Sequence, residues 1–370
     1  MARPNITYAT TFSLVIAVCM GAINMGRAAV PAIFIFGDST VDVGTNNYLN
    51  GTAALANFPY NGIDFPESIS TGRFSNGYNI ADALAMLLGF ERSPEPYLYL
   101  VNHMSVYRNK ILKGVNFASA GSGILDDTGK KLWKRVVPMR KQIQQFALVR
   151  RNISEIKGEK ETAKDLSKSI FILSVGSNDI LDPFRLGTNL TKDHLMATLH
   201  PVFHQHLKNL YDLGARRFGI LPAAPIGCCP YSRALDKSEG GDGACMTEPN
   251  EFARAFYIIV DSLLESMSSE LPEMKYSLGN VYKMTKFIFK NYRSYGFKEI
   301  RKACCGSGDY NGVGYCNEAQ KPNLCKNRKD HLFWDLYHPS EAATNLSALT
   351  LYYGDNKYMK PINFHMLANV

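Results

Sequence analysis

The hydrophobic pattern of the chain contains short apolar runs without polar alternation. Ile33–Phe36 reads Ile-Phe-Ile-Phe, and Ser169–Val175 reads Ser-Ile-Phe-Ile-Leu-Ser-Val. Such runs are typical of strands that are buried on both faces of a parallel sheet. Other short apolar segments predict further strands at Val115–Ala118, Arg217–Leu221 and Tyr276–Tyr282, and a short strand or turn at His331–Trp334.

Longer segments between these runs carry apolar residues at helical spacing. In one of them, Asn76 is placed to cap a helix that runs through Leu88. The same pattern predicts helices at Met139–Arg151, Thr191–Leu213, Glu251–Leu271, Lys283–Tyr292 and Pro339–Leu351. Strands and helices therefore alternate, which favours an α/β fold with a parallel sheet and helices on both faces. Because no internal repeat interrupts the pattern, we expect residues 30–370 to form one domain.

Residues 1–29 have the three-part layout of a secretory signal peptide. Arg3 supplies the positive start, Thr11–Ile23 is mostly apolar, and the small residues Gly26, Ala28 and Ala29 follow. The apolar core is too short for a comfortable membrane span, and no later stretch approaches that length. We therefore expect a secreted protein without a stable membrane span, with an uncleaved anchor as the alternative.

The composition changes this picture little. The 370 residues are 46% hydrophobic and 20% charged, which is ordinary for a globular protein. The formal net charge is +8, but the basic residues are scattered and no basic run is interleaved with aromatic residues. This pattern argues against nucleic acid as a partner. The mild positive charge fits weak attraction to an anionic wall or membrane surface, but an ordinary solvated surface is the favoured interpretation.

Cysteines and glycosylation sequons agree with secretion. Beyond Cys19 in the signal segment, seven cysteines occur, at positions 228, 229, 245, 304, 305, 316 and 325. In an oxidising compartment they predict disulfides that staple loops, with at least one thiol left free or paired outside the chain. Zinc is the competing interpretation, but no CxxC pair supports it. Sequons predict N-glycosylation at Asn50, Asn152, Asn189 and Asn345.

Three polar clusters stand at the ends of predicted elements, and together they suggest chemistry. Ser39 follows the first strand, Gly121 and Asn178 follow two others, and Asp335 and His338 precede the final helix. A serine becomes a nucleophile when a base takes its proton, and an imidazole oriented by a carboxylate is such a base. Backbone N–H groups of Ser39 and Gly121, with the amide of Asn178, could stabilise an oxyanion.

Each of these residues also has a simpler interpretation. Ser39 could cap a helix, Asn178 could fix a turn, and Asp335 with His338 could be a surface pair. Asp179 could likewise cap the helix that follows its strand. His200 and His204 have a spacing that can bind metal, but the glutamate of an HExxH pattern is absent, so we expect exposed helix surface there.

The motifs in order resemble the plant GDSL esterase/lipase family, a branch of the SGNH hydrolases. The resemblance covers nearly all of the chain after the signal segment. It is carried by Phe36-Gly37-Asp38-Ser39 with Asp42 and Gly44, by Asn116 to Ile124, by Gly176-Ser177-Asn178-Asp179 and by Asp335-Leu336-Tyr337-His338-Pro339. Thr40 departs from the leucine of the family name, at a position that does not touch the chemistry.

The resemblance implies a fold and a role for each residue. The fold would be a three-layer α/β/α sandwich around a five-stranded parallel sheet, of the flavodoxin-like type. Ser39 would be the nucleophile, His338 the base and Asp335 its partner, with Ser39, Gly121 and Asn178 forming the oxyanion hole. No metal or organic cofactor is implied.

The sequence thus predicts a secreted serine esterase or lipase of the apoplast or cell wall, acting on a small-molecule or lipid ester through an acyl-enzyme. An acyltransferase with the same triad and a non-catalytic binding protein on the same scaffold are the alternatives. We expect a monomer, since no coiled-coil or repeat pattern occurs. The segments Thr45–Arg73 and Tyr97–Lys110 are expected to supply the pocket walls.

Overall fold

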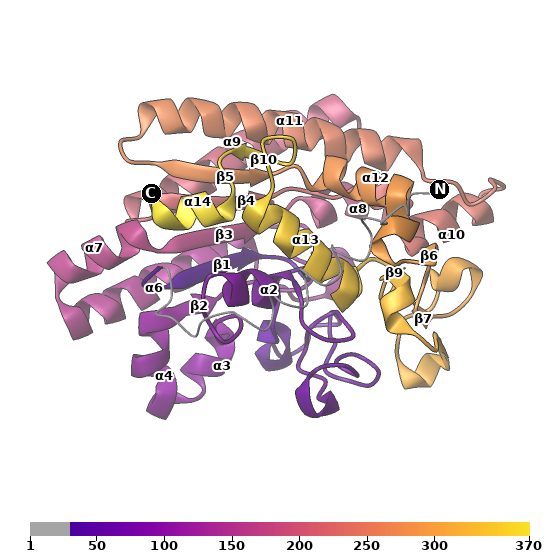
Figure 1. Cartoon of the computed structure of the whole chain (residues 1–370), viewed down its shortest axis with the longest axis horizontal. Coiled ribbons are helices and arrows are strands. Elements are labelled where there is room, and N and C mark those ends of the chain that lie inside the picture. Colours follow the sequence, from indigo (N-terminus) through magenta and orange to yellow (C-terminus); the bar gives the residue numbers. More distant parts are fainter. Residues whose placement is uncertain (1–29) are drawn as a thin grey trace, which may run out of the picture.

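The computed structural model describes residues 30–370, so the predicted signal peptide at residues 1–29 lies outside the described part of the chain. Six strands form the main sheet in the order β10-β5-β4-β3-β1-β2 (Figure 1). They are β1 (Ile33–Gly37), β2 (Gly114–Asn116), β3 (Ile170–Ser174), β4 (Arg217–Leu221), β5 (Lys275–Gly279) and β10 (Met359–Pro361).

The five strands β1 to β5 run parallel, as the sequence predicts, and helices lie on both faces of the sheet. This arrangement confirms the α/β class and the predicted five-stranded parallel core. The edge strand β10 was not predicted; it pairs antiparallel with β5. Its residues Met359-Lys360-Pro361 are too few to produce a recognisable period.

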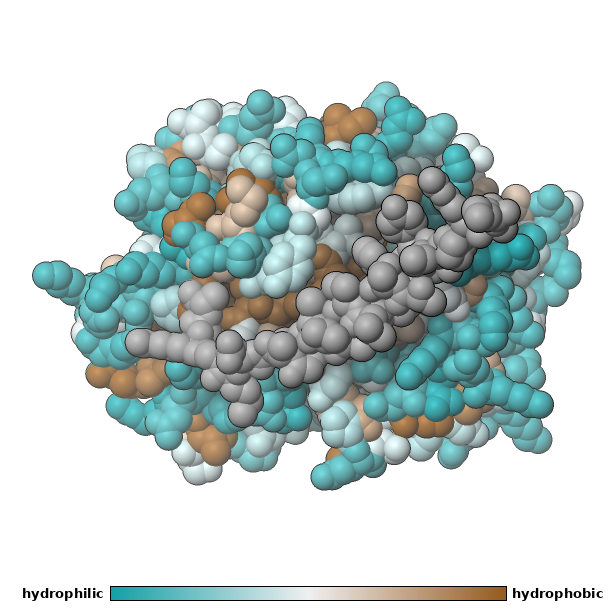
Figure 2. Space-filling view, viewed as in Figure 1, coloured by the Kyte–Doolittle hydropathy of each residue, from teal (hydrophilic) through white to brown (hydrophobic). Residues whose placement is uncertain are grey.

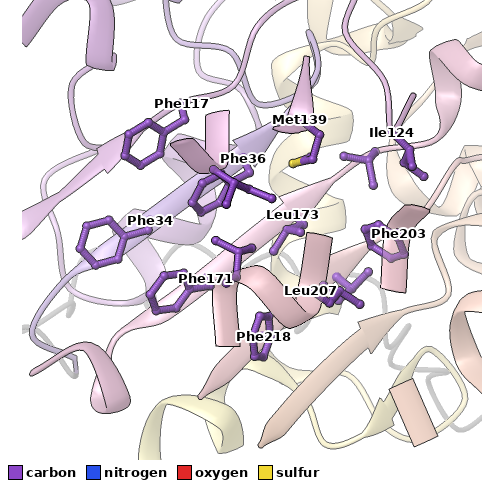
Figure 3. Close-up of a cluster of buried hydrophobic side chains, with 14 of the residues drawn as sticks. Phe34, Phe36, Phe117, Ile124, Met139, Phe171, Leu173, Phe203, Leu207 and Phe218 are labelled. Carbon is purple, nitrogen blue, oxygen red and sulfur yellow. The ribbon is translucent and has the colours of Figure 1, made fainter. Parts of the chain in front are cut away.

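Alternate residues of β1 enter two different cores, because successive side chains of a strand point to opposite faces. Phe34 and Phe36 pack on one face with Phe171 of β3, and Ile33 and Ile35 pack on the other. The ring centroids of Phe34 and Phe171 are 5.1 Å apart (Figure 3). The strand therefore needs apolar residues at every position, which explains its uninterrupted apolar run.

Helices cover both faces of the sheet. The face of Phe34 and Phe36 is covered by the amphipathic helices α6 (Met139–Lys157), α9 (Lys192–Asp212) and α11 (Thr247–Glu270), with α3 (Tyr97–Val101), α4 (Met104–Lys110), α7 (Glu159–Lys168) and α8 (Ser177–Arg185). The opposite face packs against α2 (Ile80–Leu87), α13 (Glu341–Tyr353) and α14 (Phe364–Asn369). On the side of the molecule shown in Figure 2, hydrophilic residues cover most of the visible surface, and hydrophobic residues are visible near its middle.

Several helix starts differ from the sequence prediction, since α11 begins at Thr247 rather than Glu251 and α12 at Val281 rather than Lys283. In two other helices the capping residue itself differs. Helix α2 begins at Ile80, and its cap is Asn79 rather than Asn76, since the Asn79 side chain accepts from the N–H of Ala81 and Asp82. Helix α13 is capped by Ser340, whose hydroxyl accepts from the Ala343 N–H, so Pro339 lies before the helix. In both cases a neighbouring polar side chain with better geometry satisfies the free N–H groups of the first turn.

A smaller unit follows β5 and leads into the last part of the site. It contains α12 (Val281–Asn291), the parallel pair β6 (Glu299–Ala303) and β9 (His331–Phe333), and the antiparallel pair β7 (Cys305–Gly306) and β8 (Asn323–Leu324). The short helices α5 (Lys130–Trp133) and α10 (Pro230–Ser238) complete the described elements apart from short 3-10 turns. Disulfides Cys304–Cys325 and Cys305–Cys316 staple this region.

The strand order places the candidate site at the carboxyl ends of the central parallel strands. Strand β1 lies between β2 and β3, so the chain leaves β1 toward one neighbour and returns on its other side. Such a switch point opens a crevice at the carboxyl ends of the strands, where α/β folds bind ligands. Ser39, Gly121 and Asn178 follow β1, β2 and β3 respectively, which brings three distant sequence segments to this edge.

Candidate active site

Ser39 stands just beyond a turn that only glycine permits. Gly37 has a φ of +144°, and a Cβ atom on it would lie 2.1 Å from the carbonyl oxygen of Ser174. The Gln142 side chain on α6 holds this turn, because its Oε1 accepts from the Gly37 N–H and its Nε2 donates to the Gly37 carbonyl, each at 2.9 Å. The end of β1 is therefore rigid where the serine begins.

His338 reaches Ser39 from the turn between β9 and α13. The Trp334 N–H donates to the His338 carbonyl at 2.8 Å, which closes the turn. His338 Nε2 lies 2.7 Å from Ser39 Oγ, and His338 Nδ1 lies 2.8 and 2.9 Å from the two carboxylate oxygens of Asp335. The tautomer with hydrogen on Nδ1 satisfies both contacts, since Nδ1 then donates to Asp335 and Nε2 accepts from Ser39.

The surroundings of His338 restrict its ring. His338 is 7% exposed and Asp335 is 8% exposed. The ring of Phe74 lies 5.0 Å from the imidazole, centroid to centroid. Asp335 Oδ1 also accepts from the backbone N–H of Tyr337 and His338 at 2.9 and 2.8 Å. The carboxylate is thus held by its own turn, so it does not have to be ordered when the imidazole moves a proton.

The backbone N–H of Ser39, a residue that lines the cavity beside the triad, is unused within the described residues. The Asp38 N–H donates to the Ser174 carbonyl at 3.2 Å, and the Thr40 N–H donates to the Asp38 carboxylate at 3.0 Å. Between them, the Ser39 N–H has no hydrogen-bond acceptor among residues 30–370. A donor left free between two bonded neighbours is available to a ligand at the cavity wall.

Gly121 repeats this arrangement on the neighbouring loop. The Ala120 N–H donates to the Asp42 carboxylate at 2.9 Å and the Ser122 N–H donates to the Ser119 carbonyl at 3.1 Å. In the described part of the chain, the Gly121 N–H between them has no acceptor. Its φ of +81° and the 2.5 Å that would separate a Cβ from Cδ1 of Trp133 explain the glycine.

Asn178 supplies a third group to the same cavity. Its Nδ2 donates to the Ser122 carbonyl at 2.9 Å, which uses one of the two amide hydrogens. Gly123, the other glycine of the second motif, does not line the cavity, and a Cβ there would lie 2.5 Å from the carboxylate of Asp179. Ser39, Gly121 and Asn178 all do line it.

Buried carboxylates hold the loops that carry these groups. Asp42 accepts from Gly44 and Thr45 as well as from Ala120, and burial raises its pKa to about 6. Asp179 accepts from the N–H of Ile124 and Leu125 and from the hydroxyl of Thr128. The prediction that Asp179 caps its own helix is therefore wrong, because its side chain bonds the neighbouring loop instead.

The cavity beside Ser39 has a volume of about 310 Å³ and a mostly apolar wall. The segment Thr45–Arg73 contributes to the wall, as predicted. The segment Tyr97–Lys110 does not contribute, because it forms helices α3 and α4 that pack on the core. Much of the apolar wall instead comes from α12, β9 and α13, through Val281, Met284, Ile288, Leu332, Phe333, Ala343 and Leu351.

The sequence profile of the GDSL-like lipase/acylhydrolase family matches residues 33–351, which is most of the described chain. The chain belongs to this family. It is similar to GDSL esterase/lipase At4g16230 of Arabidopsis thaliana, with 38% identity over 92% of each chain. It is also similar to GDSL esterase/lipase At2g23540, with 38% identity over 92% of this chain and 88% of the relative. A third relative, At5g55050, has 36% identity over 92% of this chain and 91% of its own length.

Membership makes the protein a GDSL esterase/lipase, an enzyme of a carboxylic ester hydrolase family. The family resemblance drawn from the sequence is thereby confirmed. The five residues singled out in this GDSL enzyme, Ser39, Gly121, Asn178, Asp335 and His338, all line one cavity. Sequence reasoning missed Phe74, which packs on His338, and Arg185, which bonds Asn178. It also missed Gln142, which holds the Gly37 turn before Ser39. None of these three stands in a local motif.

The cysteines of this GDSL enzyme form three disulfides, as expected, and the third is Cys228–Cys245. Within residues 30–370 the unpaired thiol is Cys229, which is buried. No group of three or more His, Cys, Asp or Glu side chains in this range is arranged to hold a metal ion. His200 is exposed as expected, while His204 is half-buried.

None of the helices between residues 30 and 370 has both the length and the apolarity that a membrane span requires.

Proposed function

We propose that this enzyme hydrolyses carboxylic esters through a triad of Ser39, His338 and Asp335. The observation that carries the proposal is the line of contacts from Ser39 Oγ to His338 Nε2 at 2.7 Å and from His338 Nδ1 to Asp335. His338 accepts the serine proton as Ser39 attacks the ester carbonyl, and it returns that proton to the departing alcohol. Asp335 stabilises the imidazolium, and water then releases the acid from the acyl-enzyme.

The negative charge on the attacked oxygen would be stabilised by the Ser39 N–H, the Gly121 N–H and the Asn178 amide. The support for this assignment is that these donors share one cavity and that both backbone groups are free between bonded neighbours. Donors that are already in place need no reorganisation when charge develops, so their effect falls on the transition state.

The acyl or alcohol part of the substrate is proposed to be apolar. The wall beyond Ser39 is built from side chains such as Met284, Ile288 and Leu351, and burial of each methylene group of a ligand contributes about 0.8 kcal/mol. The ester is thus a small molecule or lipid with a hydrocarbon portion.

We further propose that the protein is secreted after removal of residues 1–29 and acts outside the cell as one domain and a monomer. The three disulfides suit an oxidising compartment. Asn50, Asn189 and Asn345 are exposed, as glycosylation requires. Asn152 is half-buried and its Nδ2 donates to the hydroxyl of Tyr107, so a glycan at this fourth proposed site would replace that bond.

The test is labelling by a fluorophosphonate probe, which reacts with activated serines. Wild type, Ser39→Ala and Ser232→Ala would be purified from a secretory host. Ser232 is a matched control because it is a buried serine whose hydroxyl donates to the Ile226 carbonyl. Labelling and ester turnover should be lost in Ser39→Ala alone, with turnover reduced by roughly 10³-fold or more. Equal labelling of Ser39→Ala and wild type would refute the assignment.

A further inference from the structure

A buried arginine lies next to the proposed oxyanion donor Asn178 and has no part in the triad. Arg185 is the last residue of α8, and Asn178 is the second. Seven residues make about two helical turns, so the two side chains share a face of α8. Both line the cavity beside Ser39. The arginine therefore stands behind the amide on the same rigid element.

Arg185 is held firmly and keeps its charge. Its side chain is 7% exposed, and its Nη1 lies 3.0 Å from Oδ1 of Asp182. The guanidinium lies over the ring of Tyr337, 4.3 Å from the centroid. Burial by itself would lower the pKa of Arg185, but Tyr337 and Asp182 outweigh it and hold that pKa above its usual value. A cation is thus fixed in a mostly apolar wall.

The contacts of the Asn178 side-chain amide leave one of its two N–H donors free. Arg185 Nη1 donates to Asn178 Oδ1 at 3.3 Å, and Asn178 Nδ2 donates to the Ser122 carbonyl at 2.9 Å. An amide nitrogen carries two hydrogens, so one remains. Because the bond from Arg185 fixes which end of the amide is oxygen, it also fixes the direction of the remaining N–H. Without Arg185, only the bond to Ser122 would define this orientation.

We propose that Arg185 is a positioning residue that acts through Asn178. It orients the amide so that the free N–H points to the oxyanion, and its positive charge on Oδ1 polarises the amide and strengthens that N–H as a donor. No covalent step is involved. The inference rests on the proposed role of Asn178 in the oxyanion hole. It predicts an effect on the transition state rather than on substrate binding.

A purely structural role for Arg185 makes a different prediction. The ion pair with Asp182 and the contact with Tyr337 could simply stabilise α8. In that case replacement of Arg185 would lower stability, and any effect on turnover would not depend on Asn178. A double-mutant cycle separates the two roles, because only residues that act through one another give non-additive effects.

The experiment measures kcat and KM of wild type, Arg185→Met, Asn178→Ala and the double variant with a soluble short-chain ester. Arg185→Met should lower kcat by roughly 10- to 100-fold with KM nearly unchanged, and Asn178→Ala by about 100- to 1,000-fold. In the Asn178→Ala background, Arg185→Met should change kcat by less than about threefold. Arg151→Met, which removes an exposed arginine from α6, should leave kcat unchanged.

Removal of Arg185 leaves the Asp182 carboxylate without its cation, so the fold is checked by thermal melting. If Arg185→Met does not fold, Arg185→Met/Asp182→Asn removes both charges and takes its place in the cycle. Equal losses of kcat in both Asn178 backgrounds, or an unchanged kcat in Arg185→Met, would overturn the inference while leaving the oxyanion role of Asn178 intact. A wild-type kcat in Asn178→Ala would refute that role and the inference with it.

Discussion

The ion pair of Arg73 and Asp82 offers a sharp test of how the active-site wall is anchored. Arg73 Nε and Nη2 donate to the two oxygens of Asp82 at 2.7 and 2.8 Å, and the two side chains are 6% and 0% exposed. Arg73 directly precedes Phe74, whose ring packs against His338. The pair therefore ties the segment before α2 to that helix and fixes one neighbour of the proposed base.

The cost of removing Arg73 follows from what Asp82 would retain. In Arg73→Met, the buried carboxylate keeps only the N–H groups of Asn79 and Ser93, at 3.1 and 3.2 Å. An unpaired buried charge of this kind costs about 4 kcal/mol in the free energy of unfolding. Adding Asp82→Asn removes that charge, so Arg73→Met/Asp82→Asn should be more stable than Arg73→Met by about 1 kcal/mol or more.

Urea unfolding of the purified variants measures these differences. The matched control is Lys208→Met, which breaks the exposed pair of Lys208 and Asp212 on α9 and should cost less than about 0.5 kcal/mol. A loss below about 1 kcal/mol in Arg73→Met would refute the reasoning, as would a double variant less stable than Arg73→Met. Turnover of folded Arg73→Met should also fall, since Phe74 loses its support beside His338.

Two further predictions concern acid and oxidation. Burial lowers the pKa of His206 below 6.5, so below about pH 6.5 the unfolded chain binds a proton that the folded chain does not, and wild type should lose stability as pH falls. Urea unfolding at several pH values should show that the free energy of unfolding falls less with decreasing pH in His206→Gln than in wild type. His200→Gln, at an exposed position, should behave like wild type. The same pH dependence in His206→Gln and wild type would contradict the prediction. Removing the disulfide with Cys304→Ser/Cys325→Ser opens a loop of 21 residues. The free energy of unfolding, measured in urea, should fall by about 3 kcal/mol. A loss under about 1 kcal/mol would contradict this and show that other contacts hold the loop.

The parallel sheet could be predicted because its strands are buried on both faces. Ile33–Phe36 of β1 and Ile170–Leu173 of β3 are all buried and apolar, which produces a run that a half-exposed strand does not show. The edge strand β10 could not be predicted in this way, since two of its three residues are exposed. Its place in the sheet depends on pairing with β5, a contact 80 residues away in the chain.

Helix starts were less predictable, because several polar residues near each start can serve as caps. Asn76 and Asn79 are chemically identical, and the sequence does not reveal which one faces the first turn. In the structure Asn76 bonds instead to the Glu341 N–H and to Asp64. The Asp179 side chain likewise bonds a neighbouring loop, at Ile124 and Thr128, instead of capping its own helix. Tertiary partners thus decided among side chains whose local preferences are equal.

The same distinction separates the residues proposed to react from those that hold them. Ser39 and Gly121 stand in short motifs, because the positive φ of Gly37, two residues before Ser39, and of Gly121 itself requires glycine at those positions. Arg185 and Gln142 act through single side chains that project from ordinary helices. Asp42 shows why both kinds are needed, because its carboxylate takes the Ala120 N–H and so leaves Gly121 as the free donor between bonded neighbours. The N–H groups that remain free at this edge are therefore those that the surrounding acceptors do not use.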